Sequence, residues 1–161
     1  MRSVTVALAA LAASAALALA ASPDRPPDPE PSPDLTPGEV VRVQVEALGR
    51  NDEPTPDAGI GAAFRFASPA NRAATGPLGR FTQMVKEGYG DMLTFDRAEY
   101  GLLRVEGDQA AQEVTLVQAD GRRTTYLFAL SRQTGGACDG CWMTDGVLRQ
   151  RVPSTNGVRR V

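Results

Sequence analysis

The sequence predicts an α+β domain in which N-terminal helices are followed by an antiparallel β-meander. Two observations support this class. Between residues 35 and 88, helix-start patterns with a Ser or Thr near a proline recur, and apolar residues follow at helical spacing. From about residue 95, short runs of alternating apolar residues are separated by turn dipeptides, as in antiparallel strands.

Residues 1–20 have the pattern of an export signal. Arg2 gives a positive start, the following stretch is mainly Ala, Leu and Val, and Ala18-Leu19-Ala20 presents small residues at alternate positions to a signal peptidase. We expect cleavage after Ala20, a periplasmic or secreted protein, and no stable membrane insertion afterwards. The alternative is a retained membrane anchor, which needs about 20 strongly apolar residues, whereas this stretch is mostly alanine.

Two segments flank the predicted single domain, residues 35–150. Residues 21–34 are rich in proline and acids, so we expect a disordered, extended linker that cannot join a core. Residues 151–161 carry arginines and no acid, with a proline and a glycine that break any helix, so we expect a flexible basic tail.

The first helix should begin at Pro37 and end near Asn51. Thr36 and Glu39 have the spacing of a capping box, and the helix carries apolar residues at helical spacing. Shorter helices should follow from Asp57 and from the prolines within residues 68–77. These helices form the first half of the domain.

Four strands are expected near residues 100–105, 110–118, 124–131 and 142–148. Asp120-Gly121 marks the hairpin between the second and third strands. The third strand is apolar on both faces, which predicts a central strand that is covered on two sides.

The composition excludes several function classes. Histidine is absent, so Ser-His-Asp and Cys-His catalysis cannot occur within this chain, and a conventional zinc site is not expected. The formal net charge is −2, and loss of Arg2 with the signal would make the chain more acidic, so no nucleic-acid partner is expected. We predict no cofactor and no metal.

Cys138-Asp139-Gly140-Cys141 is the one compact motif in the chain. In an oxidising compartment two cysteines at this spacing can pair, and we expect a structural disulfide that closes the last hairpin. The alternatives are a redox-active pair or a metal site. In thioredoxin-like proteins such pairs begin a helix after a strand, whereas this pair lies in a Gly-rich connection between predicted strands.

The remaining polar and aromatic candidates point to a ligand pocket or to acid–base chemistry. An Asp–Tyr pair in an apolar cavity can catalyse enolisation without histidine, because the carboxylate moves the proton and the phenol supports the oxyanion. Asp145 is expected to cap a turn or to bond backbone amides beside Gly146 rather than act as a buried acid. The candidate pocket residues are Tyr89, Asp96, Tyr100, Tyr126, Trp142 and Asp145.

Three segments, Phe64–Arg72, Thr75–Pro77 and Trp142–Val147, resemble an exported bacterial family, domain-of-unknown-function family 4864. The resemblance covers about residues 35–148. The family in turn resembles the superfamily of nuclear transport factor two, ketosteroid isomerase and the SnoaL-like cyclases. This implies a curved sheet around helices with a cavity, and no activity, since that superfamily contains enzymes and binders alike.

The leading hypothesis is therefore an exported, non-catalytic domain that binds a small apolar or amphipathic ligand, or a protein partner. The first alternative is an Asp/Tyr acid–base isomerase or cyclase-like enzyme. The second is a thiol–disulfide protein that uses Cys138 and Cys141. Homodimerisation through the open sheet face is a further hypothesis from the superfamily resemblance.

The disulfide prediction can be checked on the exported protein. Mass spectrometry should show the pair two hydrogen atoms lighter than the dithiol, and the reduction potential should be low, because structural disulfides resist the glutathione pool. Loss of the bond should loosen the last hairpin and leave the fold intact, since the loop that it closes is short. An oxidising potential together with an acidic thiol would instead favour the redox alternative.

Overall fold

Helices precede strands along the chain, as the sequence predicts. The structure is a computed structural model that describes residues 29–150, so the predicted signal, most of the linker and the basic tail lie outside the described residues. The α-helices are α1 (Pro37–Gly49), α2 (Ala58–Arg65), α3 (Pro69–Thr75) and α4 (Leu78–Gly88). The strands are β1 (Arg97–Glu106), β2 (Gln109–Val117), β3 (Arg123–Arg132) and β4 (Trp142–Arg149). Short 3-10 helices, η1 (Gly90–Met92) and η2 (Gly136–Cys138), precede β1 and β4.

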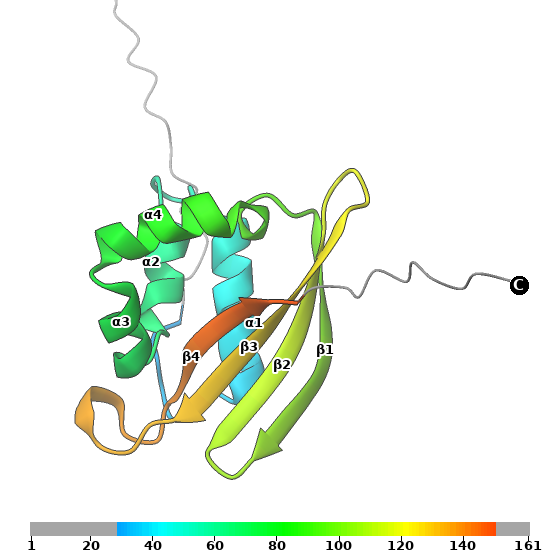
Figure 1. Cartoon of the computed structure of the whole chain (residues 1–161). Coiled ribbons are helices and arrows are strands. Elements are labelled where there is room, and N and C mark those ends of the chain that lie inside the picture. Colours follow the sequence, from blue (N-terminus) through cyan, green and yellow to red (C-terminus); the bar gives the residue numbers. More distant parts are fainter. Residues whose placement is uncertain (1–28, 151–161) are drawn as a thin grey trace, which may run out of the picture.

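The four strands form one antiparallel sheet in the order β1-β2-β3-β4, with the helices on one face (Figure 1). The α+β prediction, with helices followed by a β-meander, is confirmed. No helix among residues 29–150 is long and apolar enough to cross a membrane.

The capping box that starts α1 is present. The Thr36 Oγ1 atom accepts a hydrogen bond from the Glu39 backbone N–H at 3.3 Å, and the Glu39 carboxylate accepts one from the Thr36 N–H at 2.8 Å. This satisfies two backbone donors at the helix start. The buried face of α1 is Val40, Val41, Val45 and Leu48.

A glycine brings α2 close to the end of α1. A Cβ atom on Gly59 would lie 2.0 Å from the Ala47 carbonyl oxygen, so only glycine fits there. The Gly59 N–H donates to the Asn51 carbonyl at 2.9 Å, and the Asn51 side chain accepts from the Ile60 N–H at 3.0 Å. The two helices therefore contact each other through backbone as well as side chains.

The sheet has one buried face and one open face. The inner face packs against the helices and buries Val114, Leu116, Tyr126, Phe128 and Leu130. On the outer face Leu127 is only half-buried and Leu148 is 61% exposed. The expectation that the third strand is covered on two sides is wrong, because among the described residues all helices lie on one face (Figure 1).

The connection between α2 and α3 forms an isolated parallel β-bridge with the outer edge of β4. The Thr144 N–H donates to the Phe66 carbonyl at 2.8 Å, and the Ser68 N–H donates to the Thr144 carbonyl at 2.9 Å. Ala67 forms the bridge with Thr144. The helical half of the domain is thus hydrogen-bonded directly to the last strand.

The side chain of Thr144 extends this contact into the core. Its hydroxyl donates to the Gln44 Oε1 atom at 2.6 Å, and the Gln44 amide donates to the Ala63 carbonyl at 3.0 Å. The Asn71 amide donates to the Thr144 carbonyl at 2.9 Å. Gln44 and Thr144 are 5% and 1% exposed, so these polar groups depend on one another for hydrogen bonds.

Cys138 and Cys141 lie at disulfide-bonding distance, with their Cα atoms 5.5 Å apart. The Cys138 sulfur lies 3.6 Å from the Pro31 carbonyl oxygen, and Glu30 forms an ion pair with Arg65 at 3.0 Å. The last residues of the predicted linker therefore contact the domain beside this loop.

Replacing Thr144 with Val should lower the free energy of unfolding by about 1–3 kcal/mol, because the buried Gln44 oxygen loses its donor. Urea unfolding measures the change. The control is Thr115→Val, since the Thr115 hydroxyl pairs with Thr125 at 2.8 Å on the open face of the sheet. Equal effects of the two substitutions would contradict a special role for the buried contact.

Candidate functional site

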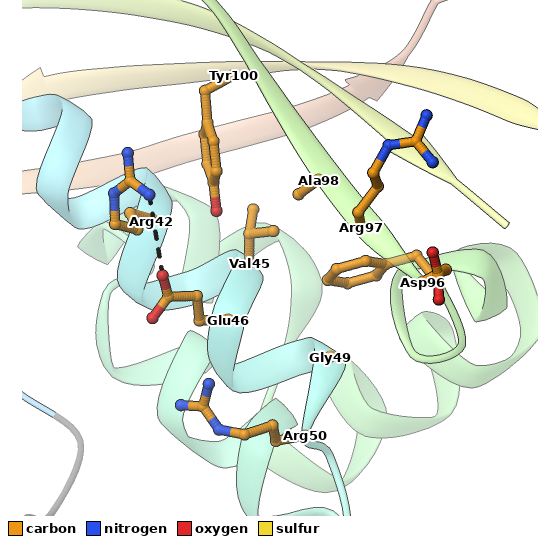
Figure 2. Close-up of a pocket in the computed structure, with 10 residues that line it drawn as sticks. Arg42, Val45, Glu46, Gly49, Arg50, Asp96, Arg97, Ala98 and Tyr100 are labelled. Carbon is orange, nitrogen blue, oxygen red and sulfur yellow. Dashed lines mark ion pairs between the residues drawn. The ribbon is translucent and has the colours of Figure 1, made fainter. Parts of the chain in front are cut away.

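A groove of about 380 Å³ lies between the second half of α1 and the start of β1 (Figure 2). Helical periodicity places the α1 residues on one face, and alternation along β1 directs Ala98 and Tyr100 towards the same space. The lining residues are Arg42, Val45, Glu46, Gly49, Arg50, Phe95, Asp96, Arg97, Ala98 and Tyr100.

Tyr100 and Arg42 form one end of the groove. The Arg42 guanidinium lies 4.5 Å from the centre of the Tyr100 ring, and Arg42 forms an ion pair with Glu46 at 4.0 Å. Burial and the charge of Glu46 raise the pKa of Tyr100, while Arg42 opposes them. The phenol is therefore a neutral hydrogen-bonding group at neutral pH.

Phe95 and Gly49 close the other part of the groove. A Cβ atom on Gly49 would lie 2.7 Å from the Phe95 ring, so the absence of a side chain lets the ring lie against α1. Figure 2 shows Asp96 at the far end of the groove from Arg42, with its carboxylate directed away from Tyr100. The groove therefore combines aromatic surface with separated charges.

A second group of polar residues joins η1 to β3 and β4. The Tyr126 hydroxyl donates to the Asp91 carboxylate at 2.7 Å, and the Arg149 guanidinium donates to Asp91 at 2.5 Å and to the Tyr126 oxygen at 2.8 Å. The ring of Tyr89 lies 5.9 Å from that of Tyr126, and its hydroxyl donates to the Val147 carbonyl.

The protonation states of Asp91 and Tyr126 favour a structural role over proton transfer. Burial raises the pKa of Asp91, but hydrogen bonds from Tyr126 and Thr124 and the charge of Arg149 outweigh it and lower that pKa overall. Burial and the neighbouring Asp91 raise the pKa of Tyr126. At neutral pH the carboxylate stays ionised and the phenol stays neutral, so Asp91 is a weak base.

Comparison with known proteins agrees with the sequence pattern. The family model described as a domain of unknown function, DUF4864, matches residues 33–156, which is most of the chain. The chain belongs to this family. Comparison with curated proteins and with solved structures found no match. The family prediction is confirmed, and the likeness to nuclear transport factor two stays a prediction.

In this DUF4864 domain, two of the segments that resemble the family meet in space. Residues 64–72 supply Phe66, Ser68 and Asn71, and residues 142–147 supply Thr144, to which all three are hydrogen-bonded. Arg72 also belongs to the first segment and donates to the Ala67 carbonyl at 3.0 Å. These residues connect the helical half of the domain to the sheet through hydrogen bonds.

The DUF4864 structure divides the six candidate pocket residues among separate places. Asp96 and Tyr100 line the groove, whereas Tyr89 and Tyr126 lie beside Asp91. Trp142 is 9% exposed and packs in the core. Asp145 accepts a hydrogen bond from the Ser131 hydroxyl at 2.9 Å, so it contacts a neighbouring strand instead of capping a turn.

Sequence patterns missed part of the groove of the DUF4864 domain. The spacing of Arg42 and Glu46 is visible as an i, i+4 pair, but such pairs are usual on solvated helix faces. Nothing in the sequence marks Phe95, which lies outside the predicted elements. Among residues 29–150 no group of acids and cysteines could hold a metal ion.

A second hollow, of about 590 Å³, lies over α3 and α4. Its lining has no aromatic residue and offers no pair of carboxylate and tyrosine. The lining residues are Ala74, Thr75, Arg80, Gln83, Met84, Glu87 and Gly88. The groove at Tyr100 is therefore the more selective candidate in the DUF4864 domain.

Replacing Asp91 with Asn should lower stability at neutral pH, because the hydrogen bonds from Arg149 and Tyr126 lose an ionised acceptor. Since the pKa of Asp91 is lowered by folding, its contribution is present above the ordinary aspartate pKa. It is lost as the pH falls through the lowered value. Thermal unfolding from pH 7 downwards should show the difference between wild type and variant shrinking in acid.

The control for this prediction is Asp120→Asn, which removes an exposed ion pair with Arg122. An exposed pair contributes about 0–1 kcal/mol, so this variant should differ little from the wild type. A stability difference for Asp91→Asn that stays constant into acid would contradict the assignment.

Proposed function

We propose that this chain is an exported, non-catalytic binding domain that takes a small amphipathic ligand in the groove between α1 and β1. The observation that carries the proposal is the lining of the groove. Phe95 and Tyr100 offer aromatic surface, the Tyr100 hydroxyl offers a neutral polar contact, and Arg42 lies beside it. Ligand sites combine apolar and aromatic walls with a few polar groups in this way.

The non-catalytic character is supported by the state of the candidate acids. The Asp–Tyr pair that is hydrogen-bonded, Asp91 and Tyr126, is also bonded to Arg149, and its Tyr126 ring is fully buried. Asp96 and Tyr100 share the groove but are directed apart (Figure 2). An isomerase or cyclase-like enzyme needs both groups at one substrate atom, so this alternative has less support.

The thiol–disulfide alternative also has less support. Cys138 lies in η2, at the end of a loop, and not at the start of an α-helix whose dipole would lower the thiol pKa. Its sulfur contacts the Pro31 carbonyl. These contacts fit a structural disulfide.

A protein partner is a second candidate, favoured by the outer face of the sheet. Leu127 and Leu148 are register partners on that face, and Leu148 is 61% exposed. Exposed apolar residues on an uncovered sheet face can mark a protein contact. A partner of this kind, including a second copy packed face to face, would use a surface distinct from the groove.

A thermal-shift screen tests the ligand proposal, with a panel of metabolites and single-chain lipids added to the exported protein. A ligand present at 100 times its dissociation constant stabilises the folded state by about 2.7 kcal/mol, which raises the melting temperature by several degrees. The variant Tyr100→Leu should abolish the shift, because it removes the hydroxyl and the aromatic ring.

The matched control is Met84→Ala in the second hollow, which should leave the shift unchanged. Loss of the shift in Met84→Ala with its retention in Tyr100→Leu would move the site to α4. Turnover of a bound compound would contradict the non-catalytic proposal and support the Asp/Tyr alternative.

A further inference from the structure

The strand β1 lies at an edge of the sheet with no neighbour on its outer side among residues 29–150 (Figure 1). The opposite edge differs, since residues 66–68 are hydrogen-bonded to β4 there. An open edge presents unpaired backbone N–H and C=O groups that can pair with another chain. β1 is long for an edge strand, contains no proline, and exposes Leu102 by 75% and Val105 by 50%.

Four charged residues of β1 point to the outer face of the sheet. The register pairs Arg97 with Val117, Glu99 with Thr115, Arg104 with Ala111 and Glu106 with Gln109. All four partners are alternate residues of β2, so the four charges share one face. In order along the strand they are basic, acidic, basic and acidic.

When two β1 strands run antiparallel, this order of charges places each basic residue opposite an acidic residue of the other strand. When a second β1 runs antiparallel to the first, Arg97 meets the partner's Glu106 and Glu99 meets the partner's Arg104. On the inner face Ala98 meets the partner's Val105, and Tyr100 meets the partner's Leu103. A parallel alignment in the same register would place like charges opposite each other, so the pattern selects the antiparallel arrangement.

A β-bulge makes this pairing compatible with two-fold symmetry. In a symmetric antiparallel pair, residues at equal distance from the axis must lie on the same face of the sheet. In a regular strand Arg97 and Glu106 would lie on opposite faces, because an odd number of steps separates them. The register shift between Tyr100 and Leu103 places one extra residue there and returns Arg104 and Glu106 to the face of Arg97.

The bulge is held from inside the domain. The buried Gln112 side chain donates to the Gly101 carbonyl at 3.1 Å, and a Cβ atom on Gly101 would lie 3.2 Å from the Glu113 carbonyl oxygen. The bulge is therefore fixed by contacts within one chain and does not depend on a second copy. It lies midway between the charged ends of β1.

Two of the four charges have no partner within residues 29–150. Arg97 and Glu99 pair with each other, and Glu99 also pairs with Arg123 on β3. Arg104 and Glu106 form no ion pair and no side-chain hydrogen bond with any residue from 29 to 150. These two are the charges that a second copy would satisfy.

We propose that two copies of this chain pair antiparallel through β1, with the two-fold axis at the bulge, so that their sheets become continuous. Backbone hydrogen bonds between the edges supply the affinity, and the cross-strand charges set direction and register. Leu102 lies next to the axis, opposite Gly101 of the second copy. Ala98 and Tyr100 also line the groove, so this contact adds Val105 and Leu103 of the second copy beside the groove. The apolar residues of β3 and β4 on the outer face stay open.

Sedimentation equilibrium of the full chain, purified after processing by the producing cell, tests this proposal. The wild type should show the mass of a dimer that dissociates on dilution. Arg104→Glu creates two like-charge pairs with Glu99 and should raise the dissociation constant about tenfold. Leu102→Lys, at an exposed position, places two like charges next to the axis and should also weaken the dimer.

Two matched controls separate this dimer from other contacts. Arg80→Glu makes the same charge change on α4, away from β1 (Figure 1), and should keep the dimer. Leu148→Lys alters the outer face and should also keep it. Hydrogen exchange of the β1 amides should slow at concentrations at which the dimer forms.

A monomer at all concentrations overturns the proposal, whether the edge is free or holds a peptide of another protein. A dimer that survives Arg104→Glu and Leu102→Lys but is lost in Leu148→Lys also overturns it, and assigns the contact to the sheet face. The sedimentation test is made without ligand, so its failure can be told apart from a failure of the thermal-shift test for ligand binding.

Discussion

The contact between Thr144 and the helical half of the domain is the interaction on which the remaining structure depends. One residue of β4 uses its N–H, its carbonyl and its hydroxyl to bond Phe66, Ser68 and Gln44. Buried polar groups of this kind are costly unless all are satisfied, so the contact permits one arrangement of helices against the sheet. That arrangement sets α1 beside β1, where the groove lies.

Local signals explain why the fold was predictable. Thr36 and Glu39 define the start of α1 through bonds between residues close in sequence, and Asp120-Gly121 defines a hairpin in the same way. The open outer face was mispredicted because an apolar alternation in β3 does not show whether a second layer exists. Tyr126 and Leu127 are both apolar in pattern, but only Tyr126 meets the helices.

The site was less predictable than the fold because it depends on contacts distant in sequence. Asp96 and Tyr100 were candidates by residue type, and their shared groove arises only when β1 packs beside α1. The sequence does not mark Gly49 or Phe95 as part of the groove. A glycine near a helix end usually indicates a cap and not a contact with an aromatic ring. Residue type therefore identified part of the lining, and tertiary packing decided the rest.

The position of Thr144 near the end of the chain also affects the order in which the domain can form. Its hydroxyl bond to Gln44 spans 100 residues of sequence, and contacts between such distant residues form slowly. During synthesis the helices appear first, but the edge to which residues 66–68 are bonded does not exist until β4 is made. Gln44 and residues 66–68 therefore lack their hydrogen-bonding partner until β4 is made, so the final packing is reached only when nearly the whole domain has left the ribosome.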